Sequence, residues 1–321
     1  MRGDRQGYRE ALAKGLTVLR FEKWCNALRL LHPTRLFSAG LLLLSIGGNA
    51  SADASSAALQ LHIDRAITPL MQQYAIPGMA VGVTIAGRHT FFNYGIASRQ
   101  TQRPVNGDTL FEIGSISKTL TATLTATLAA YAEDQGHLAL SDSTTKYYPS
   151  LRGSAFDTIR LLDLATHTSG GLPLQVPEAI ATTDQLMTYF RNWQPAHAAG
   201  TYREYSNPGL GLLGMIAAKS MDMSFVDALQ TRLFPLLGMT HSYLDIPAAH
   251  LPDYAQGYTK QDVPIRVSPG MLDAQAYGVK STSADMLRFI DANLQTGVSG
   301  TALQRALART HTGYFKAGAL T

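Results

Sequence analysis

Ser115 and Lys118 stand three positions apart, where an extended segment, Leu110–Gly114, leads into a helix that we expect to begin near Thr119. Residues at this spacing share one face of a helix. A serine hydroxyl is a weak nucleophile until a base takes its proton, and a buried lysine with a lowered pKa can be that base. At a helix N-terminus, the backbone N–H of Ser115 would also stabilise an oxyanion. The pattern therefore predicts a serine nucleophile paired with a lysine base.

The same spacing occurs a second time, in Ser143-Thr144-Thr145-Lys146. This match lies in a polar stretch before Tyr147-Tyr148-Pro149, and such a stretch is typical of a solvated loop. The change from strand to helix at Ser115 favours the first match as the reactive site.

A second polar group, Tyr205-Ser206-Asn207, lies between Gly200-Thr201 and a helix expected to start around Leu210. A tyrosine beside a lysine can share its proton traffic, and the Asn amide offers a donor and an acceptor to an amide-bearing substrate. On its own, a Tyr-x-Asn triplet is more often a turn with an Asn cap.

The elements expected around these residues are a hairpin and a series of helices. Apolar spacing predicts a helix over Leu59–Tyr74, and two strand-like runs, Met79–Ile85 and Thr90–Gly95, predict an antiparallel hairpin joined by Ala86–His89. Further helices are expected from Thr119 onward and at Ile159–Ala165, Thr183–Asn192, Leu210–Ser220 and Phe225–Leu237. We therefore expect an α/β fold in which a helical insertion, about residues 119–240, follows a hairpin that needs later strands to complete its sheet.

The charge of the chain argues against a nucleic-acid partner. The formal net charge is +4, but residues 1–52 hold eight Lys or Arg against three Asp or Glu, a net of +5, which leaves −1 for the rest. Residues 53–321 therefore have no positive excess to steer a polyanion.

The first 52 residues have the pattern of a signal peptide. A basic segment precedes the apolar run Leu36–Gly48, which is shorter than the roughly 18 residues of a membrane-spanning helix, and Ala50-Ser51-Ala52 follows. We expect cleavage after Ala52 and a periplasmic product without stable membrane association; a buried N-terminal helix or an uncleaved anchor stays open. The only cysteine, Cys25, lies in this segment, which excludes disulfides and thiolate catalysis in the mature chain.

The remaining polar residues have plain interpretations. Trp193 is expected in the core, and Asp285 and Asp291 on the solvated face of a helix. Four histidines show no metal-ligand spacing, so we expect no metal or other cofactor: His167, His197, His241 and His250.

From about Leu61 to Thr321, the chain resembles the serine β-lactamase and penicillin-binding superfamily, and class C serine β-lactamases in particular. Five segments carry the resemblance: Phe111–Thr119, Leu164–Pro177, Tyr205–Asn207, Val267–Gly270 and Ala276–Ser281. It implies a β-lactamase/transpeptidase-like fold, an antiparallel sheet flanked by helices plus a helical domain, with residues 53–321 as the β-lactamase domain. Ser115 would lie between the sheet and the helical part.

The resemblance implies hydrolysis of β-lactams, of the cephalosporinase type, through an acyl-enzyme. Ser115 would be the acylated nucleophile, and Lys118 with Tyr205 would form the base network. Water would then attack the acyl-enzyme from the Tyr205 side, without a metal. The enzyme would be a monomer acting on small molecules.

The resemblance also implies the substrate contacts. Gln175 and Asn207 would bind the amide side chain of the substrate, and Tyr277 would line the pocket wall. Two alternatives remain: a D-alanyl-D-alanine carboxypeptidase or esterase on the same scaffold, which Leu172–Pro177 disfavours, and a non-catalytic fragment.

One departure concerns the third motif of the superfamily, Lys-Thr-Gly, which is absent from the sequence. We reject His311-Thr312-Gly313 as its substitute, because only eight residues follow and Arg309–Phe315 resembles a class C segment upstream of that motif. We therefore expect a truncated chain that lacks the C-terminal strands. It should be inactive and poorly stable, because the hairpin Met79–Gly95 would keep an open apolar edge.

Overall fold

The structure is a computed structural model, and it describes residues 48–135, 138–268, 270–295 and 300–316. By its internal contacts the chain forms two compact units, Met1–Ala57 and Ala58–Thr321. Most of the predicted signal peptide, residues 1–47, lies outside the described residues, and the predicted cleavage point after Ala52 falls within the first described helix. In the described part of the chain, no helix is long and apolar enough to cross a membrane.

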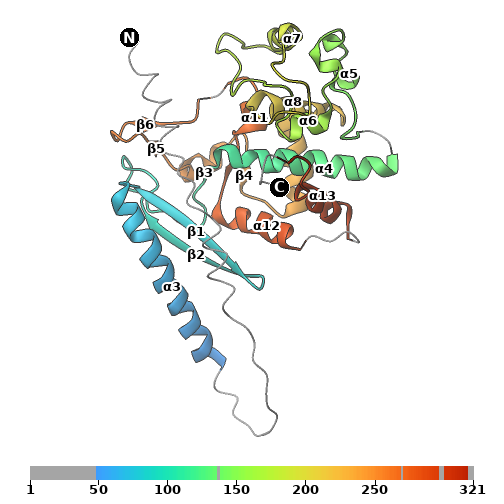
Figure 1. The fold of residues 1–321 in the computed structure, drawn as a ribbon. Coiled ribbons are helices and arrows are strands. Elements are labelled where there is room, and N and C mark those ends of the chain that lie inside the picture. Colours follow the sequence, from blue (N-terminus) through green and yellow to red (C-terminus); the bar gives the residue numbers. More distant parts are fainter. Residues whose placement is uncertain (1–47, 136–137, 269, 296–299, 317–321) are drawn as a thin grey trace, which may run out of the picture. The chain divides into compact units, whose positions relative to one another are not determined.

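Helices dominate the chain after the first hairpin (Figure 1). The helices are α3 (Gly48–Gln73), α4 (Ser117–Gln135), α5 (Thr144–Tyr147), α6 (Leu161–Ala165), α7 (Thr183–Asn192), α8 (Asn207–Lys219), α9 (Phe225–Asp227), α10 (Phe234–Leu237), α11 (Asp273–Ala276), α12 (Ser283–Leu294) and α13 (Ala302–Thr310). The strands are β1 (Gly78–Ile85), β2 (Arg88–Gly95), β3 (Phe111–Glu112), β4 (Ser242–Tyr243), β5 (Gly257–Tyr258), β6 (Pro264–Ile265) and β7 (Lys280–Ser281).

The predicted hairpin is confirmed, with a tighter turn than expected. β1 and β2 pair antiparallel from Gly78↔Gly95 to Ile85↔Arg88, so only Ala86 and Gly87 form the turn. Both have positive φ, 50° and 76°, as the favoured two-residue hairpin turn requires. Tyr94 of β2 donates its hydroxyl to Asp64 of α3 at 2.7 Å.

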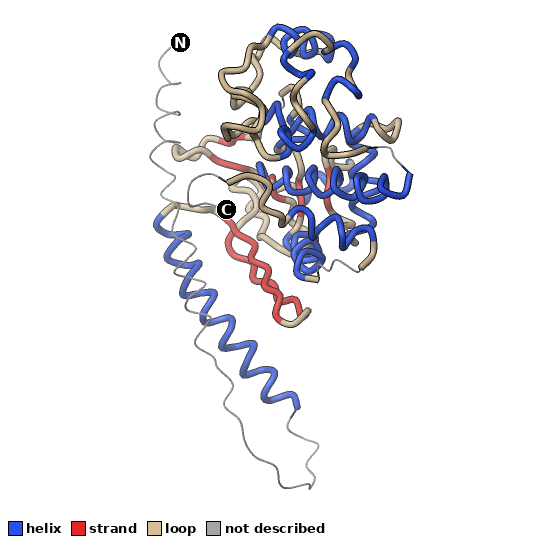
Figure 2. Tube along the Cα trace, turned by 45° about the vertical axis from the view of Figure 1, so that its right-hand side comes forward, coloured by secondary structure: helices blue, strands red, loops and turns tan. Residues whose placement is uncertain are grey.

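Among the described residues, no strand pairs with the outer edge of β1. The other strands form separate small sheets, β3-β7-β4 and β5-β6, and Figure 2 shows the hairpin as a two-stranded ribbon. Within the described chain, β1 and β2 therefore form a sheet of their own.

The helix α4 is the centre of the helical part. In Figure 1 it runs between α8 and α11 on one side and α13 on the other, and it packs against all three. Its buried threonines satisfy their hydroxyls on backbone carbonyls, for example Thr123 on Thr119 at 2.8 Å and Thr125 on Thr121 at 2.9 Å. Because those hydroxyls need no water, a helix with threonine on several sides can be enclosed.

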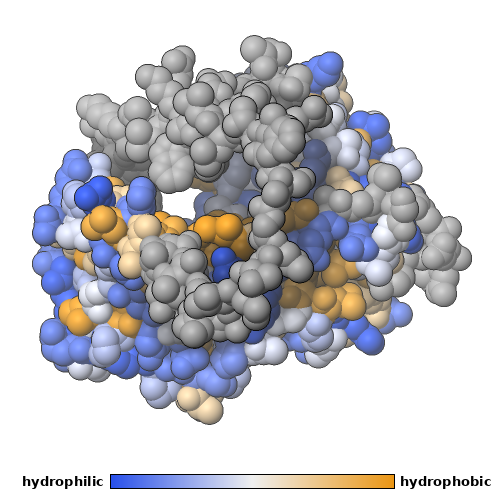
Figure 3. All heavy atoms as spheres, turned by 90° about the horizontal axis from the view of Figure 1, so that it is seen from below, coloured by the Kyte–Doolittle hydropathy of each residue, from blue (hydrophilic) through white to orange (hydrophobic). Residues whose placement is uncertain are grey.

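Two apolar clusters form the core. One gathers Leu120 and Leu124 of α4 with Phe234 and Phe289, and the other lies beneath α6, α7 and α8. Trp193 packs on the second cluster, with its ring 5.7 Å from that of Phe156, which confirms the core interpretation. Apolar side chains also remain in the open, as on the face drawn in Figure 3.

The expectation that Asp285 and Asp291 lie on a solvated helix face is wrong, because both carboxylates accept hydrogen bonds from other segments. Asp285 is fully buried at the start of α12, where its carboxylate accepts the backbone N–H of His241 and the hydroxyl of Ser242 at 2.7 and 2.8 Å. Asp291 accepts the hydroxyl of Thr84 at 2.8 Å and lies 2.5 Å from the His89 ring. Helical spacing cannot tell which carboxylate meets donors from distant segments.

The second Ser-x-x-Lys match is ordered rather than a solvated loop. Ser143 caps the short helix α5, and its hydroxyl donates to the carbonyl of Asp157 at 3.0 Å. Lys146 pairs with Asp142 at 2.9 Å. The serine is used for capping, so it is not a base-activated nucleophile.

Candidate active site

Ser115 sits in a 3-10 turn, Gly114–Ile116, between strand β3 and helix α4. Gly114 has a φ of +53°, which lets the chain turn sharply from strand to helix. The start of α4 is fixed to the residue that precedes β7, because the backbone N–H of Val279 donates to the hydroxyl of the buried Ser117 at 3.1 Å. The backbone N–H of Ile116 donates to the carbonyl of Ile113 at 3.2 Å. The N–H of Ser115 comes before this bond in the turn, so it is the group that can bind an oxyanion.

Lys118 is 7% exposed, and its Nζ donates to Ser115 Oγ at 3.1 Å and to the carbonyl of Ala276 at 2.8 Å. Burial lowers the pKa of Lys118, against a smaller opposing effect of Tyr205. A neutral amine keeps its bond to the Ala276 carbonyl while its lone pair accepts the Ser115 proton. Burial therefore shifts Lys118 toward the neutral amine that a general base needs.

Tyr205 comes from the segment before α8 and reaches the same oxygen. Its hydroxyl donates to Ser115 Oγ at 2.8 Å, and Lys118 Nζ lies 4.8 Å from its ring centre. Tyr205 is 38% exposed, so the phenol stands at the open side of the group. Ser115, Lys118 and Tyr205 thus meet at one oxygen across 90 residues of chain.

The three predicted substrate contacts lie on the segments around this oxygen. Asn207 begins α8, its backbone N–H donates to the carbonyl of Leu174 at 3.2 Å, and its buried Oδ1 has no donor within the described part of the chain. Burial raises the pKa of Tyr277, and the nearby Gln175 side chain opposes that rise. Tyr277 directly follows Ala276, whose carbonyl accepts the Lys118 Nζ. An unpaired buried acceptor two residues after Tyr205 is suited to an amide N–H of a substrate.

Sequence reasoning missed His167, which it considered only as a metal ligand. Its ring centre lies 4.7 Å from that of Tyr205, and its Nδ1 accepts the backbone N–H of Ser206 at 3.2 Å. Burial, together with the nearby charges of Arg203 and Lys118, lowers the pKa of His167 to about 4. Its place inside Leu164–Pro177, one of the segments that carry the resemblance, was the only available signal.

The segment His311-Thr312-Gly313 lies in the turn after α13 and not on a strand. The His311 ring is 2.8 Å from Asn293 Oδ1. Thr312 lines a cavity of about 210 Å³ whose walls include none of the six predicted site residues. The structure does not bring this segment to Ser115.

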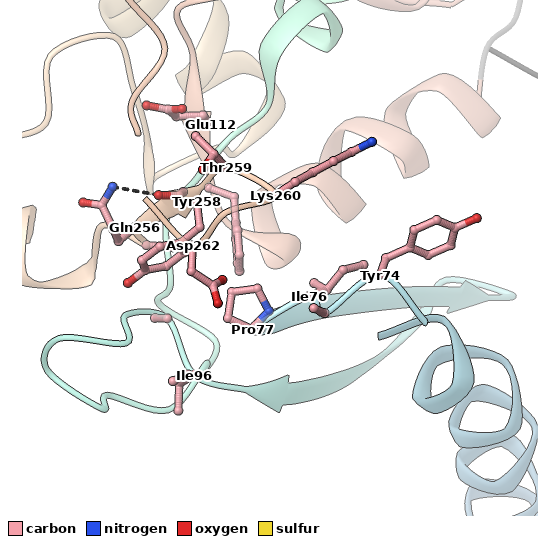
Figure 4. Close-up of a pocket in the computed structure, with 16 residues that line it drawn as sticks. Tyr74, Ile76, Pro77, Ile96, Glu112, Gln256, Tyr258, Thr259, Lys260 and Asp262 are labelled. Atoms are coloured by element: carbon pink, nitrogen blue, oxygen red, sulfur yellow. Dashed lines mark hydrogen bonds between the residues drawn. The ribbon is translucent and has the colours of Figure 1, made fainter. Parts of the chain in front are cut away.

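A second cavity, of about 370 Å³, lies beside β3 (Figure 4). Glu112 lines it, and so do Tyr258, Lys260 and Asp262 of the loop around β5. The hydroxyl of Tyr254 donates to Glu112, which fixes β3 from this side. None of the six predicted site residues lines the cavity. Among the described residues, no group of three or more His, Cys, Asp or Glu could hold a metal ion.

Comparisons with known proteins identify the family of the chain. The family model described as Beta-lactamase matches residues 63–321. The beta-lactamase of Lysobacter lactamgenus is 46% identical over 288 residues, which is 89% of this chain and 74% of that protein. The beta-lactamase of Pseudomonas fluorescens is 45% identical over 259 residues, 81% of this chain and 71% of that protein.

Solved structures give the same result. A class C beta-lactamase in complex with cefoxitin has a TM-score of 0.76 and 49% identity, over 82% of this chain and 72% of that one. A beta-lactamase/D-alanine carboxypeptidase from Pseudomonas syringae has a TM-score of 0.77 and 48% identity, over 81% and 72%. The chain, with its β-lactamase/transpeptidase-like fold, belongs to the class C branch of the beta-lactamase family.

Proposed function

We propose that this protein hydrolyses the amide of β-lactam antibiotics through an acyl-enzyme on Ser115. The observation that carries the proposal is the meeting of Lys118 Nζ and the Tyr205 hydroxyl on Ser115 Oγ, at 3.1 and 2.8 Å. A serine held between two groups that can exchange its proton is an activated nucleophile.

The acylation step follows from these contacts. Ser115 Oγ attacks the lactam carbonyl carbon while its proton passes to the Lys118 amine and Tyr205, and the Ser115 N–H stabilises the oxyanion. As the carbon–nitrogen bond breaks, the pair returns that proton to the lactam nitrogen. A water activated on the Tyr205 side then cleaves the ester and regenerates Ser115.

The substrate would be held by the residues around this oxygen. Asn207 Oδ1 accepts an amide N–H of the substrate side chain, Gln175 donates to its carbonyl, and Tyr277 forms the pocket wall. The unpaired acceptor of Asn207 supports this arrangement. We propose cephalosporins as the preferred β-lactams.

A peptidase activity is the second candidate, because the similar protein from Pseudomonas syringae is described as a beta-lactamase/D-alanine carboxypeptidase. Both activities share the acylation of serine and differ in what acylates it. A peptide ending in D-alanyl-D-alanine therefore belongs in the same assay as a β-lactam.

The test is acylation followed by turnover. The 321-residue protein is mixed with a fluorescent penicillin, the labelled peptide is identified by mass spectrometry, and hydrolysis of nitrocefin and release of D-alanine are then measured. Label on the Ser115 peptide is the expected result, and nitrocefin turnover would overturn the expectation that the 321-residue chain is inactive. Release of D-alanine with a stable penicillin adduct would instead show a carboxypeptidase, and no label would refute the proposal.

Export of the protein to the periplasm as a monomer, without stable membrane association, is also proposed. The signal-peptide pattern ending at Ala52 supports export. In a Gram-negative host, N-terminal sequencing of the periplasmic fraction should find a product that starts near Asp53. A membrane-bound product that retains Met1 would contradict cleavage.

A further inference from the structure

One residue holds the chain on both sides of Tyr205. The Nδ1 of His167 accepts the backbone N–H of Ser206 at 3.2 Å, and the carbonyl of His167 accepts the backbone N–H of Glu204 at 2.9 Å. The His167 ring also lies against the Tyr205 ring, with 4.7 Å between centres and 32° between planes. The position of the phenol therefore depends on three contacts with a single residue.

Burial makes these contacts necessary. Ser206 is fully buried, so its backbone N–H has no access to water, and an unpaired N–H there would destabilise this arrangement. Ser206 also caps α8, because its hydroxyl accepts the N–H of Gly209 at 3.0 Å. His167 itself is 9% exposed and has a φ of +60°, a conformation that side chains other than glycine rarely adopt. The packing around His167 therefore holds its backbone in this conformation.

The contacts require a neutral ring. A nitrogen that accepts an N–H carries no proton, so the proton of the neutral imidazole is on Nε2. The charged groups that face the ring are Lys118 of α4 and Arg203 of the segment before α8, and both disfavour an imidazolium. Tyr205, which stacks on the ring, and Glu204, whose backbone N–H binds the His167 carbonyl, are further titratable neighbours.

We propose that His167 is a positioning residue: it holds the Tyr205 hydroxyl at Ser115 Oγ by accepting the Ser206 N–H and by stacking on the phenol ring. The inference rests on the proposed acylation of Ser115. His167 acts through Tyr205, so it should affect the rate of acylation more than the binding of the β-lactam.

Two variants separate the two contacts. His167→Phe keeps a ring but removes the acceptor, and His167→Asn keeps an acceptor near the place of Nδ1 and tolerates a positive φ. The matched control is His197→Phe, because His197 stacks on Tyr202 at 4.2 Å on the neighbouring exposed loop and is bound to no predicted site residue. Circular dichroism and thermal unfolding check that each variant is folded.

The first measurement is the acylation rate with the fluorescent penicillin. The limiting rate constant should fall about 10- to 100-fold in His167→Phe, as expected for an orphaned buried N–H. It should fall less in His167→Asn and stay unchanged in His197→Phe, while the concentration for half-maximal rate changes little in all three. A folded His167→Phe protein with the wild-type rate would overturn the proposal.

The second measurement is the pH profile, which a purely structural role would not change. Below about pH 4 the wild-type His167 gains a proton and can no longer accept the Ser206 N–H. His167→Asn has no such group, so the ratio of its acylation rate to the wild-type rate should rise as the pH falls to that range. A constant ratio would overturn the proposal.

The third measurement does not depend on acylation. Nitrogen-15 chemical shifts of the imidazole at neutral pH should show Nδ1 unprotonated and Nε2 protonated. A protonated Nδ1 would overturn the inference even if Ser115 is acylated. If the wild-type protein is not acylated although Nδ1 has the expected state, the failure lies with the proposed function.

Discussion

Two serines of this chain precede a lysine at the same spacing, but only Ser115 touches its lysine. Lys118 Nζ is 3.1 Å from Ser115 Oγ, whereas Lys146 pairs with Asp142 and Ser143 caps a helix. Local context decides between them, because the lysine at 118 is buried and the lysine at 146 is half exposed and already paired with a carboxylate.

Substituting the two serines should therefore have opposite effects on labelling by the penicillin. Ser115→Ala should abolish labelling by the fluorescent penicillin and lower any nitrocefin turnover by about 10⁴-fold or more, because the nucleophile and its base act as a unit. Ser143→Ala should keep the wild-type labelling rate and lose only about 1 kcal/mol of unfolding free energy, as expected for a lost N-cap. Loss of labelling in Ser143→Ala with retention in Ser115→Ala would place the nucleophile elsewhere.

At the scale of the element, the hairpin depends on two glycines with similar backbone angles and different surroundings. Gly87 in the turn has a φ of +76°, with no atom within 4 Å of the position of an added Cβ. Gly95 at the end of β2 has a φ of +66°, and an added Cβ would lie 2.1 Å from the carbonyl oxygen of Pro77.

Alanine substitutions at Gly87 and Gly95 separate the cost of a left-handed backbone conformation from the cost of a steric clash. Gly87→Ala should lower the free energy of unfolding by about 1–2 kcal/mol, because only the left-handed backbone conformation is penalised. Gly95→Ala should lower it by about 3 kcal/mol or more, because the backbone of Pro77 must also move. Urea unfolding measures both, and equal losses would show that the hairpin end adapts to the side chain.

At the scale of the molecule, the outer edge of β1 is a strand edge that no other described strand covers. The N–H of Ile96 donates to the carbonyl of Pro77 at 2.8 Å. Because backbone groups alternate in direction along an antiparallel ladder, the N–H groups of Met79 and Val81 point toward β2, and the N–H of Ala80 points toward the open edge. Ile85 at the end of the strand is 54% exposed. Unpaired edges of this kind promote association between chains.

Proline on alternate residues of β1 tests this liability. Ala80→Pro removes an N–H that no other described segment accepts, so it should reduce aggregation of the purified chain while the fold is kept. Val81→Pro removes a bond to β2 and should unfold the hairpin. Light scattering measures the aggregation of each variant, and circular dichroism shows whether it is folded. Unchanged aggregation of a folded Ala80→Pro protein would show that the β1 edge is not its cause.

The sequence by itself determined the parts that depend on neighbours along the chain. The hairpin follows from two alternating runs around a turn, the bounds of α7 match the predicted Thr183–Asn192, and Ser115 and Lys118 meet because a spacing of three places them on one turn of helix. The sequence also carried the motifs from which the family was predicted, and the comparisons confirm that family.

Only the tertiary structure decided which distant groups meet. Asp285 is buried because the backbone of His241 and the hydroxyl of Ser242 donate to it, and neither donor is near it in the sequence. Tyr205 reaches Ser115 across 90 residues, and His167 supports it from a third segment. Spacing along the chain specifies the face of an element, but long-range packing brings those faces together and sets which donors and acceptors remain unpaired.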